Sequence, residues 1–110
     1  MNKYGAKKCT IDGHKFDSLA EGNYYLILRD RLKKQEIDEL QVHPFFHIQI
    51  NGKKICKVLL DFSYYDNKLC KDIYVDVKGF ATSVSKLKKK MVEAQFGIKV
   101  DWVDSDGNLI

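Results

Sequence analysis

The chain has 110 residues, 45% of them hydrophobic, and this size and apolar fraction predict one compact domain with a filled core. The net charge of +4, from 19 basic and 15 acidic residues, permits nucleic-acid binding without requiring it. No segment approaches the roughly 18 consecutive apolar residues of a membrane span, and the first residues lack the apolar run of a signal peptide, so we expect a cytoplasmic protein without a membrane partner.

The first third of the chain predicts a basic arm, a hairpin and a helix. Residues 1–8 are basic and turn-rich, as in a flexible arm. Asp12-Gly13 predicts a tight turn between two short extended pieces. From Ser18 to about Lys34, apolar residues recur with helical spacing, which predicts the first helix.

The middle of the chain predicts strands. Pro44 interrupts the segment LQVHPFFHIQI, which is typical of an edge or irregular strand, and Asn51-Gly52 is a strong hairpin signal. The segments KVLLDFSYY and DIYVDVK are rich in β-branched and aromatic residues and are separated by the turn-forming DNK. We therefore expect a second hairpin made of these two strands.

The last third predicts a second helix and a final strand. From about Thr82 to Phe96, helical spacing places Val84, Leu87, Met91 and Ala94 on one face. The segment IKVDWV then predicts one more strand. The order helix, three strands, helix, strand indicates an α/β or α+β domain in which helices flank one sheet.

Three polar residues stand out in the predicted second hairpin. Asp76 and Lys78 are two apart in a strand and therefore share a face. An even number of loop residues would bring Asp61 to the same face, and a loop of four would place it opposite Tyr74 and diagonal to Asp76, about 7 to 8 Å away. Two such carboxylates can bind one Mg²⁺ or Mn²⁺, and the lysine can neutralise a phosphate oxygen.

Each of these residues also has an ordinary structural interpretation. Asp76 and Lys78 can form an exposed ion pair worth less than about 1 kcal/mol. Glu21, on the first helix, is a candidate third acid for the site. The segment from Ser18 to Glu21 also fits a capping box, in which Glu21 turns back toward the start of its own helix.

Several short motifs carry a family resemblance. LDF at Leu60–Phe62, VDVKG at Val75–Gly79 and SLAEGNYY on the preceding helix resemble the PD-(D/E)XK nuclease superfamily. More closely, KYGAKK, DGHKFDSLAE, LDFSYY and DVKGF are similar to a small phage-encoded family within it, related to Holliday junction resolvase-like endonucleases. The resemblance covers nearly the whole chain and implies a single domain over residues 1–110. Its implied fold is a restriction-endonuclease-like core with a mixed αβββαβ sheet.

The resemblance also implies roles for residues. By position, Asp61 and Asp76 match the two metal-binding acids, Lys78 the catalytic lysine and Glu21 a helix-borne acid that also binds the metal, with Mg²⁺ or Mn²⁺ as the cofactor. Leu60 stands where the superfamily has the proline that names its motif, which weakens the recognition more than the chemistry.

The implied function is a metal-dependent phage DNA endonuclease in the host cell cytoplasm. Branched or recombination-intermediate DNA is the implied substrate, and a homodimer would supply two active sites for two symmetric cuts. The alternative is a non-catalytic module on the same fold that binds nucleic acid or a host protein.

Two groups of lysines are candidate DNA contacts, although lysine runs are also common on solvated faces. One group lies on the N-terminal arm and the other on the second helix. They are Lys3, Lys7 and Lys8, and Lys86, Lys89 and Lys90.

The histidines and cysteines predict no metal site of their own. His43 and His47 are four residues apart, which in a strand separates them by about 13 Å, so a shared ion is not expected. Cys9, Cys56 and Cys70 lack zinc-ligand or disulfide spacing, and we expect them to be buried structural residues.

Overall fold

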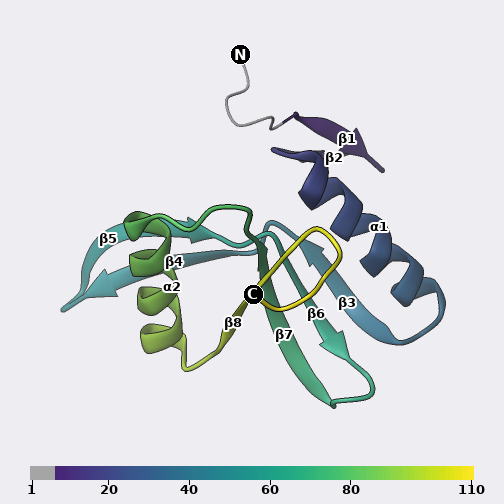
Figure 1. Ribbon diagram of the computed structural model, residues 1–110. Helices are drawn as coiled ribbons and strands as arrows, with labels where there is room; N and C mark the ends of the chain where they lie inside the picture. The colour runs from purple at the N-terminus through teal and green to yellow at the C-terminus, as the bar shows by residue number, and fades with distance from the viewer. Residues whose placement is uncertain (1–6) are drawn as a thin grey trace.

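The computed structural model describes residues 7–110, which form eight strands and two helices (Figure 1). Lys3 and most of the expected arm lie outside these residues. Lys7 and Lys8 are exposed and lead into the first strand. Neither helix within residues 7–110 is long and apolar enough to span a membrane.

A mixed four-stranded sheet forms the centre of the molecule, in the order β3-β6-β7-β8. β7 and β8 run parallel, and the other neighbours are antiparallel. With the two helices, these strands follow in the chain order α1, β3, β6, β7, α2, β8, which confirms the expected mixed α+β architecture. The bounds are Leu19–Lys33 for α1, Ile37–Val42 for β3, Phe62–Asp66 for β6, Lys71–Val77 for β7, Ser83–Phe96 for α2 and Val100–Val103 for β8.

Two separate hairpins complete the fold. β1 (Cys9–Ile11) pairs with β2 (His14–Phe16), and β4 (Phe45–Ile50) pairs with β5 (Lys53–Leu59). The expected turns at Asp12-Gly13 and Asn51-Gly52 are confirmed, and all four turn residues have positive φ angles between 49° and 80°. Paired positive φ angles are typical of the type I′ turn, whose twist matches that of its strands.

The expected strand KVLLDFSYY is wrong as a single element. β5 ends at Leu59 and β6 begins at Phe62, and the two strands belong to different sheets. The N–H of buried Leu60 donates to the Pro44 carbonyl at 2.9 Å, which turns the chain from one sheet into the other. Pro44 lies where the chain passes from the main sheet into the β4–β5 hairpin, between the end of β3 and the start of β4. It lacks the N–H that would extend the strand ladder, so the ladder is interrupted there.

The two faces of the main sheet pack on different partners. α1 and the β1–β2 hairpin cover one face, and α2 and the β4–β5 hairpin pack on the other. The aromatic residues Tyr24 and Tyr25 of α1 are buried against Phe62.

The expected packing face of α2 is wrong. Val84 and Leu87 are 58% and 56% exposed and Ala94 is exposed, whereas the helix is buried at Val92. α2 packs through its C-terminal half on β8 and the β4–β5 hairpin, with Met91 only partly buried. Its N-terminal half lies beyond this contact, next to the end of β7.

The substitution Gly22→Ala tests how closely α1 packs on the β1–β2 hairpin. A Cβ atom there would lie 2.6 Å from Cys9 Sγ, so Gly22→Ala should cost about 1–3 kcal/mol through overpacking, although alanine favours an ordinary helix interior. Gly79→Ala is the control, because nothing lies within 4 Å of its added Cβ. Denaturant unfolding should also show partial rescue when Cys9→Ala is added to Gly22→Ala. A Gly22→Ala variant more stable than wild type would contradict the packing.

Candidate metal centre

Two segments cross where the chain passes between the main sheet and the β4–β5 hairpin. His43 follows β3 and Asp61 precedes β6, and the His43 backbone N–H donates to the Asp61 carbonyl at 2.9 Å. His43 has a φ of 56°, a left-handed conformation that is uncommon for residues with a side chain. Such strain persists only where the surrounding structure holds it, and it is concentrated at functional sites.

Glu21 reaches the same crossing from the first turn of α1. Ser18 caps this helix, because its Oγ accepts from the Glu21 N–H at 3.1 Å. The Ser18 hydroxyl also donates to Glu21 Oε2 at 3.1 Å. Only the Ser18 half of the expected capping box forms, because Glu21 Oε2 accepts from the Ser18 hydroxyl and not from its backbone N–H, and the carboxylate also approaches Asp61.

Glu21, His43 and Asp61 form a cluster with the composition of a metal site. One potential ligand atom of each lies within 4.8 Å of the others, and all three residues are half-buried. Neighbouring ligands of an ion bound at about 2.1 Å are about 3.0–3.4 Å apart, so atoms at the upper end of the observed separation would have to approach by more than about 1 Å to bind one ion together. Two carboxylates and an imidazole fit a divalent cation.

Asp76 stands beside this cluster and supports Asp61. The Asp61 N–H donates to Asp76 Oδ1 at 2.9 Å, and the Val77 N–H donates to Asp61 Oδ2 at 2.7 Å. Both contacts hold the Asp61 carboxylate at the ends of β6 and β7. Asp76 is not part of the three-residue cluster, so the ion expected between Asp61 and Asp76 shifts toward Glu21 and His43.

The register of the β6–β7 hairpin differs from the expected one. The loop has four residues, 67–70, an even number as expected, but Asp61 precedes β6, so strand alternation alone does not place its side chain on the face of Asp76. However, the ladder pairs Phe62 with Val75, which places Asp61 next to Asp76 and not opposite Tyr74. The difference arises because Asp66 and Lys71 already pair at the start of the loop.

The electrostatics of the site favour a bound cation. Burial, followed by the charges of Asp76 and Glu21, raises the pKa of Asp61 to about 8. Burial also raises the pKa of Asp76, although the neighbouring Lys78 opposes this shift. The carboxylates of Glu21, Asp61 and Asp76 therefore lie close together, and their neighbouring cation, Lys78, is beside Asp76. A metal ion beside Asp61 would stabilise the ionised form of the Asp61 carboxyl.

Lys78 approaches the carboxylate oxygen of Asp76 that does not accept from the Asp61 N–H. Its Nζ is 3.6 Å from Asp76 Oδ2 and 5.9 Å from the ring centroid of Trp102. Lys89 of α2 approaches the same ring, with its Nζ 4.6 Å from the centroid. Two ammonium groups therefore approach one aromatic ring beside Asp76.

A cavity of about 230 Å³ opens next to this pair of lysines. It lies between the end of β5, the end of β7 and the first turns of α2, and Asp76, Lys78, Lys88 and Lys89 line it. Of the lysines expected on the second helix, only Lys89 reaches the cavity. Lys86 and Lys90 are exposed and are not among its lining residues, whereas Lys88, from the same run of lysines, is.

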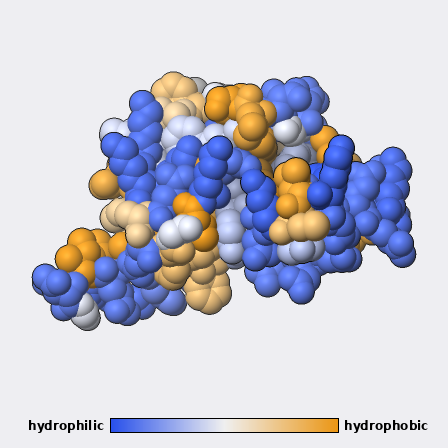
Figure 2. Space-filling view, turned by 90° about the horizontal axis from the view of Figure 1, so that it is seen from below, coloured by the Kyte–Doolittle hydropathy of each residue, from blue (hydrophilic) through white to orange (hydrophobic). Residues whose placement is uncertain are grey.

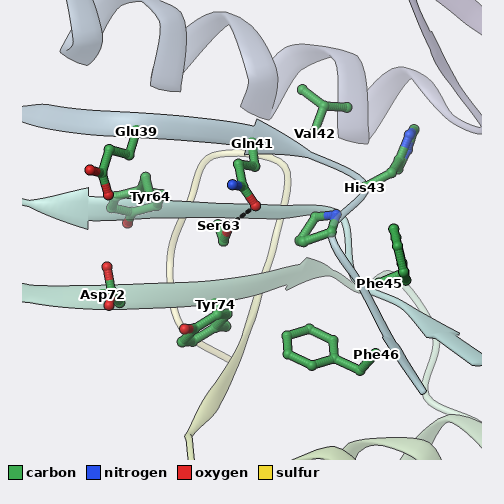
Figure 3. Close-up of a pocket in the computed structure, with 11 residues that line it drawn as sticks. Glu39, Gln41, Val42, His43, Phe45, Phe46, Ser63, Tyr64, Asp72 and Tyr74 are labelled. Atoms are coloured by element: carbon green, nitrogen blue, oxygen red, sulfur yellow. Dashed lines mark hydrogen bonds between the residues drawn. The ribbon is translucent and has the colours of Figure 1, made fainter.

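A larger hollow of about 620 Å³ lies on the same sheet face, along β3, β6 and β7 (Figure 3). Glu39 and Asp72 stand on its rim, and the Ser63 hydroxyl donates to Gln41 Oε1 at 3.3 Å within it. No lysine or arginine lines it, so its charge disfavours a phosphate ligand. The smaller, lysine-lined cavity is the better candidate for an anion.

His43 is the functional residue that sequence reasoning missed. Its spacing was compared only with His47, which does not belong to the cluster. The sequence signal that could have identified His43 is its position directly before Pro44. The proline interrupts the strand at the point where the chain passes from the main sheet into the β4–β5 hairpin. The cysteines are all free, but Cys70 is exposed in the β6–β7 turn, contrary to the expectation that it is buried.

These features define a mixed α+β domain with a carboxylate and imidazole cluster at a strand crossing and a lysine-lined cavity beside it. The chain belongs to the family described as "Protein of unknown function (DUF1064)", which matches residues 1–106. No curated protein and no solved structure matches the chain.

The raised pKa of Asp61 predicts how stability depends on pH without metal. Because this carboxyl titrates near pH 8 when folded and near its ordinary pKa of 3.8 when unfolded, the folded state binds more protons between these values. Folding stability should therefore fall as the pH rises from about 4 to about 8. Asp61→Asn removes this loss while its side-chain oxygen can still accept from Val77.

Thermal unfolding in EDTA between pH 4 and pH 8 checks this expectation. Asp61→Asn should exceed wild type in Tm by about 5 °C or more at pH 8, and the difference should shrink toward pH 4. Asp72→Asn, at an exposed position on β7, is the matched control and should follow wild type. A difference between Asp61→Asn and wild type that does not change with pH would contradict the assigned environment.

Proposed function

We propose that this protein is a metal-dependent DNA endonuclease that hydrolyses phosphodiester bonds. The observation that carries the proposal is the cluster of Glu21, His43 and Asp61 at one strand crossing, next to Asp76, which contacts both the Asp61 N–H and Lys78. The resemblance to PD-(D/E)XK nucleases independently assigns four of these five residues to catalysis. The fifth residue, His43, is added to the proposed site by the geometry of the cluster.

Glu21, His43 and Asp61 would hold the metal ion. A bound divalent ion would polarise a phosphate oxygen and lower the pKa of a bound water. Carboxylates accept both Mg²⁺ and Mn²⁺, whereas an imidazole favours transition metals, so Mn²⁺ suits this ligand set better. The placement of Asp61 depends on the backbone N–H of Val77 and on the contact of its own N–H with Asp76.

Lys78 supplies positive charge at the same strand end. Lys78 lines the cavity together with Lys88 and Lys89, so a phosphate bound there would have three basic residues around it. A preorganised ammonium stabilises the charge that develops on a phosphoryl oxygen and does so without reorganisation at the moment of reaction. Asp76 keeps Lys78 in position through the 3.6 Å contact.

The substrate class follows from the charge and from the resemblance. A phosphodiester matches the lysine-lined cavity, and the net charge of +4 favours a polyanion. Branched or recombination-intermediate DNA, a phage origin and a homodimer with two active sites come from the resemblance alone. A non-catalytic binding module on the same fold is the competing proposal.

A substitution of Lys78 distinguishes the nuclease proposal from the binding-module proposal. Lys78→Ala should lower single-turnover cleavage by about a hundredfold or more, roughly 3 kcal/mol, while DNA affinity stays nearly unchanged, because only differential stabilisation of the transition state accelerates chemistry. Lys71→Ala, at the exposed start of the same strand, is the matched control and should cleave as wild type does.

The measurement uses supercoiled plasmid, single strands, flaps and four-way junctions with Mg²⁺ or Mn²⁺. The nuclease proposal fails if wild type cuts none of these substrates with either ion. It also fails if Lys78→Ala cuts as fast as wild type, and the binding-module proposal then takes its place.

A further inference from the structure

The β4–β5 hairpin is inserted between two residues of the metal cluster. His43 stands just before it and Asp61 just after it, so its base lies at the candidate centre. From there the two strands extend away from the main sheet to the turn at Asn51-Gly52 (Figure 1). With six residues in β4 at about 3.4 Å each, the ribbon reaches about 20 Å from its base.

The ribbon carries positive charge without any negative charge. Residues 43–60 contain no aspartate or glutamate, and they contain Lys53, Lys54 and Lys57, all exposed. Within residues 7–110, no carboxylate forms an ion pair with any of these three lysines, although Lys34 and Lys99 elsewhere do have such partners. Lys57 lies opposite His47, and beyond the Ile48–Cys56 pair and a bulge, Lys54 lies opposite Gln49 and Lys53 opposite Ile50. Strand alternation therefore places Lys54 and Lys57 on the outward side and Lys53, next to the turn, on the side of Ile48.

The opposite side of the ribbon is fixed to the body of the protein. Ile48 and Val58 are buried in the core beneath α2. Gln95 of α2 accepts from the Gln49 N–H at 2.9 Å and donates to the His47 carbonyl at 2.9 Å. The edge of β4 is therefore occupied at these positions, and the ribbon keeps a fixed direction relative to the candidate centre.

We infer that the β4–β5 ribbon occupies the major groove of a B-form DNA duplex. A two-stranded antiparallel ribbon fits this groove, which is about 12 Å wide and about 8.5 Å deep. Lys54 and Lys57 on the outward side and Lys53 beside the turn match flanking phosphates, although the Lys57 Nζ also lies 4.5 Å from the Phe45 ring centroid. The exposed apolar side chains can contact thymine methyl groups. These apolar side chains are Phe45, Ile50, Ile55 and Leu59.

A second copy of the chain is the other occupant to test. Figure 2 shows hydrophobic patches separated by hydrophilic surface on the face that it views, and not one continuous apolar face. Three uncompensated lysines on each ribbon would also repel each other across an interface between two copies. The repulsion between these lysines favours a polyanion over a second ribbon.

The inference deepens the proposed function, because it places the duplex relative to the centre that would cut it. Binding is nevertheless measured without cleavage, by the fluorescence anisotropy of a labelled duplex of about 20 base pairs in EDTA. The test variant is Lys53→Ala/Lys54→Ala/Lys57→Ala. The matched variant is Lys33→Ala/Lys68→Ala/Lys71→Ala, which removes the same charge from exposed positions at the end of α1 and around the β6–β7 turn.

The ribbon variant should bind at least about tenfold more weakly at 0.15 M salt, and its slope of log affinity against log salt should fall by about 2 to 3. The matched variant should stay within about threefold of wild type. Wild type should bind double-stranded RNA of the same length more weakly than DNA, because the A-form major groove is too narrow for side chains.

Equal weakening of both variants would overturn the inference, since net charge alone would then explain binding. Unchanged DNA binding with a lower sedimentation mass for the ribbon variant would also overturn it and identify an interface between copies. The two proposals fail separately. A protein that binds through the ribbon but cuts nothing contradicts only the nuclease, and one that cuts but binds without the ribbon contradicts only this inference.

Discussion

The hydrogen bond from the His43 N–H to the Asp61 carbonyl joins the two points where the chain changes sheets. On one side of it lies the four-stranded sheet, and on the other the β4–β5 ribbon. Glu21 meets this crossing from α1, and Asp76 supports it through the Asp61 N–H. This backbone contact thus holds His43 beside Asp61 at the base of the ribbon.

The crossing concentrates negative charge in a half-buried place, which is costly for the metal-free protein. Desolvation and neighbouring carboxylates raise the pKa of Asp61, and burial raises that of Asp76. Such clusters are stabilised by a cation, so binding of a divalent ion would also stabilise the fold. Stability and chemistry are therefore coupled at the same residues, as expected where perturbed carboxylates gather.

Much of this candidate site could be predicted from local patterns in the sequence. Strand alternation placed Asp76 and Lys78 on one face, and the parity of the loop added Asp61. The register was missed because it depends on where the hairpin closes, at Asp66 and Lys71. His43 was missed because its proximity to Asp61 arises from tertiary structure. The periodicity of α2 likewise does not reveal that only its C-terminal half meets the core at Val92.

The most direct test of the account is to locate the ion itself. Crystals of the protein soaked in Mn²⁺ should show an anomalous scattering peak between the carboxylates of Glu21 and Asp61 and the imidazole of His43, at about 2.0–2.3 Å from each ligand atom. The same soak of a His43→Ala crystal should give a weaker peak. A strong peak elsewhere, or no peak at this crossing in the wild-type crystal, would contradict the account.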